Sequence, residues 1–316
     1  METTFDCVVC GTCVVDILVR PVPLEQSIGR GNLIPVEPIE VTTGGLVSNS
    51  GIAFARLGMR VAALSYVGED EWAEVIRRRY AVEGVDASRI ITRKDVATSS
   101  TAVLIDETGE HSFAHYGGAW RQMDRAFVLD NLDLFASSRF ALIGYYSLMH
   151  GVESDLPEIL AELRRVGCRT ALDAAGDGGS LQPLDRILPH LDVYVPSYAE
   201  AKQQTGKSDP REMIDVYRAC GTEALLGVKL GERGALLSRQ GGDLVEIAPV
   251  EPPEPLVDTT GAGDSFFAGL LTGLIRGMSV GEAGRLAAAT GACCVSAVGA
   301  SDGIRGFDET VKLAGL

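Results

Sequence analysis

The chain has 316 residues, of which 46% are apolar and 22% are charged, so it is long enough to bury a full-sized core. Its formal net charge of −15 argues against a nucleic-acid partner, since a phosphate backbone requires a basic surface. No apolar stretch approaches the roughly 18 residues that span a membrane, and the acidic, polar start is unlike a signal peptide. Seven cysteines without a secretion signal are typical of reduced thiols, and we expect a cytoplasmic protein.

The N-terminal stretch contains an apolar run typical of a buried strand. Phe5 to Val15 predicts an inner strand that ends at Asp16. Ligands of open α/β sheets lie at the carboxyl ends of the strands, so Asp16 is either a ligand-binding carboxylate or a turn residue. The three cysteines within the run lie on both faces of the predicted strand, and we interpret them as packing residues rather than metal ligands. Four prolines between residues 17 and 42 suit edge strands outside the main sheet.

A paired glycine, Gly44 and Gly45, precedes a predicted helix that contains Asn49 and stops at Gly58. Glycine lets the backbone approach a ligand closely, and a plain turn with a polar cap is the alternative interpretation.

The next segment predicts a strand, a helix and a hairpin. Residues 60–68 read as a strand and 69–83 as an amphipathic helix. The alternating runs over 98–106 and 110–116 indicate a hairpin. His111 and His115 lie on one face of the second run, where packing or rim positions are favoured over a metal site because no third ligand is present.

From about residue 137 the pattern alternates between strand and helix, which predicts a parallel sheet flanked by helices. The predicted strands are 140–144, 169–173, 193–196 and 225–230, and the predicted helices are 153–166, 198–205 and the segment from the next motif toward Met278.

The most informative stretch runs from Val257 to Leu270 and contains Thr260-Gly261-Ala262-Gly263-Asp264. An apolar, strand-like run is expected to end near Val257, and an apolar helix is expected to follow the turn. The first amides of a helix have no intrahelical partner and carry partial positive charge, so this turn is a candidate phosphate site. Asp264 lies in the first turn, where the helix dipole favours its ionised form, so it is a candidate base. The alternative is a plain glycine-rich turn into a core helix.

Neither common phosphate motif explains this stretch. The chain has no Gly-x-x-x-x-Gly-Lys-Ser/Thr, and Phe266 stands where a dinucleotide fingerprint has its third glycine. The stretch closely resembles the Asp-Thr-x-Gly-Ala-Gly-Asp signature of the ribokinase-like (PfkB) carbohydrate kinases, and the resemblance covers almost the whole chain.

The resemblance implies a three-layer α/β/α ribokinase-like fold with a mostly parallel central sheet and a small β-sheet lid. The large domain is expected over 1–16, 43–95 and 121–316, and the lid over 17–42 and 96–120. Sugar-binding residues implied by the family pattern are Asp16, Gly44, Gly45 and Asn49. Asp264 is the implied general base, and the amides of Gly261, Ala262 and Gly263 form the implied anion hole.

The resemblance also implies a nucleotide site. Val195-Pro196-Ser197 resembles the family's Pro-Asn-x-x-Glu element, with Ser197 in place of the asparagine and Glu200 acting on magnesium through water. Lys229 could reach phosphate oxygens or be a surface charge. Gly231, Gly234, Thr260 and Gly299 are further expected nucleotide contacts. Asp258 and Thr260 match positions where relatives bind a monovalent cation such as K⁺.

The sequence therefore predicts an ATP- and Mg²⁺-dependent kinase that phosphorylates a hydroxyl of a sugar or sugar acid. The predicted lid has no cluster of basic residues suited to a phosphorylated acceptor. A nucleoside kinase, with Phe113 and Tyr116 as an aromatic platform, is one alternative. A catalytically silent binding protein of the same fold is another. An oxidoreductase is disfavoured because no Gly-x-Gly-x-x-Gly turn follows the first strand. Exposed lid edges would suit a homodimer.

Overall fold

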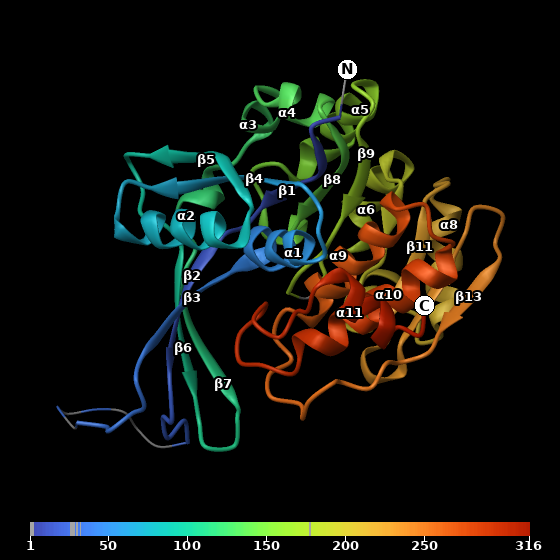
Figure 1. The fold of residues 1–316 in the computed structure, drawn as a ribbon. Helices are drawn as coiled ribbons and strands as arrows, with labels where there is room; N and C mark the ends of the chain where they lie inside the picture. Colours follow the sequence, from blue (N-terminus) through green and yellow to red (C-terminus); the bar gives the residue numbers. More distant parts are fainter. Residues whose placement is uncertain (1–2, 26–28, 30, 32, 177) are drawn as a thin grey trace.

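The computed structural model describes residues 3–25, 29, 31, 33–176 and 178–316. Two sheets organise these residues, a large one between layers of helices and a small one that projects from it (Figure 1). The expected three-layer arrangement with a mostly parallel central sheet is confirmed.

The large sheet has nine strands in the order β13-β12-β11-β10-β9-β8-β1-β4-β5. The strands from β11 to β5 pair in parallel, whereas β12 and β13 are antiparallel additions at one edge. The strands are β1 (Phe5–Gly11), β4 (Val61–Gly68), β5 (Asp86–Arg93), β8 (Ser138–Gly144), β9 (Arg169–Leu172), β10 (Val193–Tyr194), β11 (Leu225–Lys229), β12 (Ala235–Ser238) and β13 (Leu244–Ile247).

Helices cover both faces of this sheet because its inner strands are apolar on both sides. In β1, Cys7 and Val9 pack into one hydrophobic cluster, whereas Val8 and Cys10 pack into the other. The first cluster includes residues of α1 (Gly45–Arg56), α2 (Glu71–Glu83), α9 (Ala262–Ile275) and α10 (Val280–Cys294). The second includes residues of α3 (Arg125–Leu129), α4 (Leu132–Ala136), α5 (Leu156–Arg165), α6 (Leu181–Ile187), α7 (Tyr198–Thr205) and α8 (Pro210–Ala219). A last helix, α11 (Phe307–Leu313), packs against α10.

The small sheet has four strands in the order β3-β2-β6-β7. Its strands are β2 (Val14–Val19), β3 (Glu40–Gly44), β6 (Ser100–Ile105) and β7 (His111–Tyr116). The predicted hairpin is confirmed, since β6 and β7 pair in antiparallel register. In Figure 1 this sheet extends away from the main body below α2.

Two local predictions were wrong. The run from Phe5 to Val15 is two strands, because the chain leaves the large sheet at Gly11, where φ is +146° and a side chain would collide with the Gly144 carbonyl. Asp16 therefore lies within β2 of the small sheet and not at the end of an inner strand. The strand expected near Val257 is also absent: residues 248–261 form no strand, and four prolines there remove ladder donors.

Every described cysteine is a free thiol, and most are buried. Among the described residues, no cluster of three or more His, Cys, Asp or Glu side chains is suited to a metal ion. Cys7, Cys10 and Cys13 are buried within the two hydrophobic clusters, which confirms the prediction that they are packing residues. In the same described part of the chain, no helix has the length and hydropathy needed to cross a membrane.

Candidate active site

Polar side chains gather where neighbouring parallel strands end. Thr12 follows β1, Tyr145 follows β8, Asp173 follows β9, and Lys229 is the last residue of β11. Because parallel strands point the same way, their carboxyl ends share one edge of the sheet, which is where open α/β sheets bind ligands. The N-terminus of α9 completes this edge.

The turn before α9 requires glycine. Gly261 has φ of +76°, and a Cβ on it would lie 2.6 Å from the Ala300 carbonyl oxygen. The amide of Ala262 already donates to the carbonyl of Thr259 at 3.3 Å. The anion hole predicted from the sequence therefore depends mainly on the amides of Gly261 and Gly263.

Asp264 lies in the first turn of α9 and is 5% exposed. Its Oδ2 accepts two hydrogen bonds, from Nδ2 of Asn49 at 2.8 Å and from the hydroxyl of Tyr145 at 2.7 Å. Ser50 donates to the Asp264 backbone carbonyl at 3.1 Å, which ties α1 to α9. Oδ1 makes no hydrogen bond to the described residues and remains able to accept a proton.

Burial changes the expected electrostatics of Asp264. The sequence predicted that the helix dipole would favour the carboxylate, but desolvation raises the pKa of Asp264 above its usual value. The hydrogen bonds from Asn49 and Tyr145, together with the nearby Lys229 ammonium, act in the opposite direction and limit this rise. A carboxylate with a raised pKa is a stronger base than an exposed one.

Lys229 pairs with a carboxylate that sequence reasoning missed. Its Nζ lies 3.3 Å from Oδ1 of Asp173, and both side chains are largely buried. Burial alone would lower the pKa of Lys229, but Asp173, Glu200 and Asp264 raise it, so the ammonium stays charged. A Cβ on Gly263 would lie 3.3 Å from this Nζ, which places the cation beside the first turn of α9.

Ser197 and Glu200 form the capping box of α7, as the sequence predicted for a helix with a serine cap. Ser197 Oγ accepts from the Glu200 amide at 3.3 Å, and Glu200 Oε2 accepts from the Ser197 amide at 2.6 Å. The second carboxylate oxygen of Glu200 makes no hydrogen bond to the described residues. Glu200 also acts on the pKa values of Asp173 and Asp264, so its charge belongs to the same electrostatic cluster.

The two glycines after Lys229 serve the turn itself. Gly231 and Gly234 have φ of +60° and +82°, and a Cβ on Gly234 would lie 2.0 Å from the Ile247 carbonyl oxygen. Gly234 is therefore required by the β11–β12 connection whatever its part in nucleotide binding.

Asp258 joins two loops at the margin of the site. Its Oδ1 accepts from the amide of Thr260 at 2.9 Å, and its Oδ2 accepts from the amide of Gly299 at 3.0 Å. The thiol of Cys294 approaches the carbonyls of Thr260 and Ala300 at 3.4 and 3.2 Å. Asp258 and Thr260, the residues predicted to bind a monovalent cation, are thus joined by a hydrogen bond, and each carboxylate oxygen of Asp258 accepts from a backbone amide.

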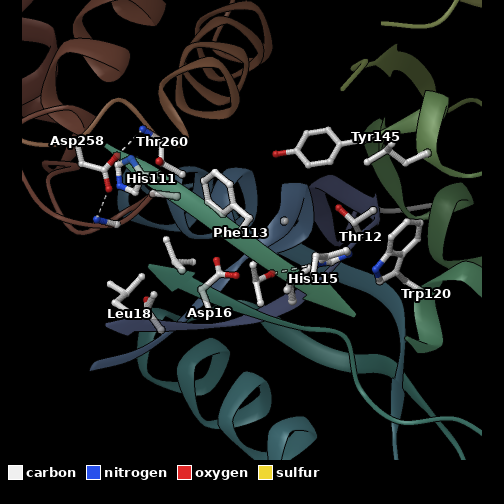
Figure 2. A pocket seen from close by; sticks show the side chains of 18 residues that line it. Thr12, Asp16, Leu18, His111, Phe113, His115, Trp120, Tyr145, Asp258 and Thr260 are labelled. Atoms are coloured by element: carbon white, nitrogen blue, oxygen red, sulfur yellow. Dashed lines mark hydrogen bonds between the residues drawn. The ribbon is translucent and has the colours of Figure 1, made fainter. Parts of the chain in front are cut away.

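The small sheet turns one face toward this edge and encloses a cavity with it (Figure 2). Asp16 pairs with Thr42 on one side and with Thr101 on the other, and Thr101 pairs in turn with His115. This polar row lines the cavity together with an apolar row two residues further along the strands, formed by Leu18, Val103 and Phe113.

The paired glycines make room for polar groups of the cavity. A Cβ on Gly44 would lie 1.9 Å from Oδ2 of Asp16, so only glycine leaves space for that carboxylate. Gly45 has φ of +78°, and a Cβ on it would lie 2.6 Å from the Thr12 carbonyl oxygen. Burial raises the pKa of Asp16 to about 6, and a hydrogen bond from Thr101 limits the rise.

The structure brings the predicted sugar-site residues near one another: Asp16 and Gly45 line the cavity, Gly44 lies against the Asp16 carboxylate, and Asn49 bonds Asp264. Tyr145 lines the cavity and bonds Asp264, so the predicted base lies behind a residue of the cavity wall. Sequence reasoning missed Tyr145, Asp173 and Trp120. Tyr145 follows one predicted strand and Asp173 ends another, and that position was the one available signal.

A glycine-rich helix N-terminus beside a buried carboxylate, at the carboxyl edge of a mostly parallel sheet, has the groups that phosphoryl transfer to a small molecule requires. Residues 6–305 match the sequence profile of the pfkB family of carbohydrate kinases. The chain belongs to the PfkB family, and its class is that of phosphotransferases with an alcohol group as acceptor.

Similar proteins agree with this assignment. The chain is 27% identical over 290 residues to a ribokinase of Haemophilus influenzae, covering 89% of this chain and 90% of the relative. It is 27% identical over 293 residues to a 2-dehydro-3-deoxygluconokinase of Bacillus subtilis, covering 87% of each. Its fold matches that of an Arabidopsis thaliana ribokinase complexed with ribose and ATP, with a TM-score of 0.83, 23% identity and complete coverage of both chains. The ribokinase-like fold expected from the sequence is confirmed.

Proposed function

We propose that the protein is an ATP-dependent kinase that transfers the γ-phosphoryl group to a hydroxyl of a sugar. The observation that carries the proposal is the position of Asp264. It is buried in the first turn of α9, held by Asn49 and Tyr145, and lies between the acceptor cavity and the Lys229 ammonium.

In the proposed reaction, Oδ1 of Asp264 takes the proton of the acceptor hydroxyl. The hydroxyl oxygen bonds to the γ-phosphorus as the bond from that phosphorus to the β–γ bridging oxygen breaks, which gives a phosphorylated sugar and ADP. General-base assistance of this kind contributes about 10²–10⁴ in rate. The Gly261 and Gly263 amides and the Lys229 ammonium stabilise the charge on the transferring group.

The residues at this edge fit a magnesium ion, because Mg²⁺ prefers oxygen ligands and usually keeps several waters. Glu200 has one carboxylate oxygen without a protein partner among the described residues and would hold the ion through water. When bound, magnesium neutralises the phosphate charge. Asp258 and Thr260 would hold a monovalent cation such as K⁺, with backbone carbonyls of the adjoining loop.

We further propose that Ser197, Gly231, Gly234, Thr260 and Gly299 border the nucleotide. The small sheet acts as a lid that closes over the acceptor and excludes water, which would otherwise compete as acceptor. Its exposed edge is the surface we propose for a homodimer.

A nucleoside is the second candidate acceptor. Phe113 lines the cavity and is 60% exposed, so its ring is available to stack on a base. Tyr116, the other expected platform residue, is not among the residues that line the cavity, which weakens the aromatic platform this candidate requires.

ADP release with Mg-ATP against a panel of sugars, sugar acids and nucleosides tests the proposal. We expect one sugar to stimulate release strongly and to yield a phosphorylated product by mass spectrometry. A nucleoside as best acceptor would favour the second candidate. No stimulation by any acceptor, while ATP raises the melting temperature, would favour a catalytically silent binding protein.

A further inference from the structure

The acceptor cavity has a distinctive balance of charge. The ionisable side chains of its described lining residues, apart from the Tyr145 hydroxyl, are the carboxylates of Asp16 and Asp258 and the imidazoles of His111 and His115, and none is lysine or arginine. Burial lowers the pKa of His115, and the nearby Arg121 lowers it further, so the imidazole is neutral at neutral pH. The cavity therefore presents negative charge to whatever enters it.

The polar row across the small sheet offers hydrogen-bonding groups to a ligand. Asp16 and Thr101 are paired across β2 and β6, and the Thr101 hydroxyl lowers the pKa of Asp16 as a donor would. The Thr101 oxygen lies 3.0 Å from Nδ1 of His115, and a Thr101 hydroxyl turned to Asp16 leaves this oxygen to accept from Nδ1. In that arrangement Nε2 of His115 is left as an acceptor.

One buried donor faces the same space. Trp120 is 2% exposed, and its indole N–H makes no hydrogen bond to the described residues. Trp120 lines the cavity, and Figure 2 shows its ring nitrogen turned inward, on the side of Thr12 and His115. A buried donor without a partner is costly, so this N–H fits a ligand oxygen.

We propose that, within the kinase function proposed above, this cavity selects a neutral sugar and rejects sugar acids and sugar phosphates. A sugar hydroxyl can donate to Asp16 or His115 and can accept from Trp120. A carboxylate or phosphate on the acceptor can only accept, and it would face the Asp16 charge without a cation to balance it.

Of the two acceptor classes that the sequence left open, sugars and sugar acids, the cavity therefore disfavours sugar acids. A sugar acid needs an arginine or lysine to receive its carboxylate, since burying an unpaired charge is unfavourable. The nearest candidate, Arg121, is exposed and lies over the Trp120 ring at 5.6 Å, outside the cavity lining.

The test compares aldoses with aldonates of the same carbon number, using both turnover and binding by calorimetry. We expect the best aldose to exceed its aldonate by about 100-fold or more in kcat/KM and in affinity. An aldonate or sugar phosphate as the best acceptor or ligand would overturn the inference. A cavity that binds neither aldoses nor aldonates would also overturn the inference.

The binding measurement keeps this inference distinct from the proposed reaction. Aldose binding without phosphoryl transfer would contradict the kinase proposal and support the cavity assignment. Transfer to an aldonate in preference to an aldose would support the kinase and overturn the assignment.

Two variants and a control locate the selectivity. Trp120→Phe removes the donor and should weaken aldose binding about tenfold. Asp16→Asn removes the opposing charge and should narrow the aldose-to-aldonate ratio at least about tenfold. Arg125→Gln is the control, because Arg125 pairs with Glu158 and does not line the cavity, so it should leave the ratio unchanged. A ratio that is unaltered in Asp16→Asn, or that changes mainly in Arg125→Gln, would contradict the assignment.

Discussion

The Tyr145 hydroxyl donates to Oδ2 of Asp264 at 2.7 Å, and Asn49 donates to the same oxygen. Two donors on one oxygen fix the carboxylate orientation and leave Oδ1 without a hydrogen bond to the described residues. Tyr145 is thus a positioning residue that connects the cavity to the proposed base.

Tyr145→Phe tests this relationship through the pH profile. A hydrogen bond to a charged group is worth about 1.5–3 kcal/mol, so its loss should raise the pKa of Asp264 by about one unit. We expect the acidic limb of kcat/KM to move upward by about one unit, so that activity at a pH on that limb falls about tenfold and recovers at higher pH. Tyr116→Phe is the matched control, since Tyr116 does not line the cavity. An acidic limb that stays in place would remove this role from Tyr145.

Gly44→Ala should displace the Asp16 carboxylate, because the new Cβ would lie 1.9 Å from its Oδ2. The colliding atom ends a side chain that can rotate, so we expect little loss of stability. The Michaelis constant for the sugar should rise at least about tenfold, since Asp16 loses its charge-assisted hydrogen bonds to the sugar. Gly51→Ala in α1, where no atom lies closer than 3.8 Å, is the control. Equal sugar kinetics in both variants would contradict the assignment of Asp16.

Gly263→Val should impair use of ATP, since its side chain would crowd the free amide and approach Lys229 Nζ. We expect the Michaelis constant for ATP to rise at least about tenfold, as several charge-assisted bonds are lost together. Gly281→Val is the control, because Gly281 occupies the same second position of α10 away from the site. An unchanged Michaelis constant and rate would remove the anion hole from this turn.

Lys229→Met should destabilise the fold by about 3 kcal/mol near pH 8, because it leaves the Asp173 carboxylate buried without its cation. Burial raises the pKa of Asp173 to about 7 even with Lys229 present. A group whose pKa is raised by folding contributes stability at low pH that is lost as the pH rises through the folded value. The loss of folding stability caused by Lys229→Met should therefore be smaller at pH 5 than at pH 8.

Chemical denaturation of Lys229→Met, Asp173→Asn and the double variant at both pH values checks this pair. The double variant should be more stable than Lys229→Met alone at pH 8. Additive effects that do not depend on pH would mean that the two groups are not coupled.

The sequence predicted those helices and turns that are specified by residues close together in the chain. The helix over Tyr198–Thr205 has its serine cap and glutamate partner, and α9 follows its glycine turn as expected. Of the predicted sugar-site residues, Asp16 and Gly45 line one cavity and Gly44 lies against the Asp16 carboxylate.

Other features depend on contacts between distant segments, which no local pattern encodes. The apolar run through Val15 continues across the break at Gly11, so hydrophobicity gave no sign that Asp16 belongs to the second sheet. Burial raises the pKa of Asp264, which is opposite to the effect of the helix dipole that its position suggested. The Lys229–Asp173 pair joins two strands 56 residues apart.

Asp264→Asn tests whether Asp264 is the general base of the proposed phosphoryl transfer. The substitution preserves the side-chain shape but removes the base, so ATP should raise the melting temperature nearly as much as in the unaltered protein. Sugar-dependent ADP release should fall by about 10²-fold or more. Near-normal turnover in this variant would contradict the assignment of Asp264 as the base, because another group would then accept the proton.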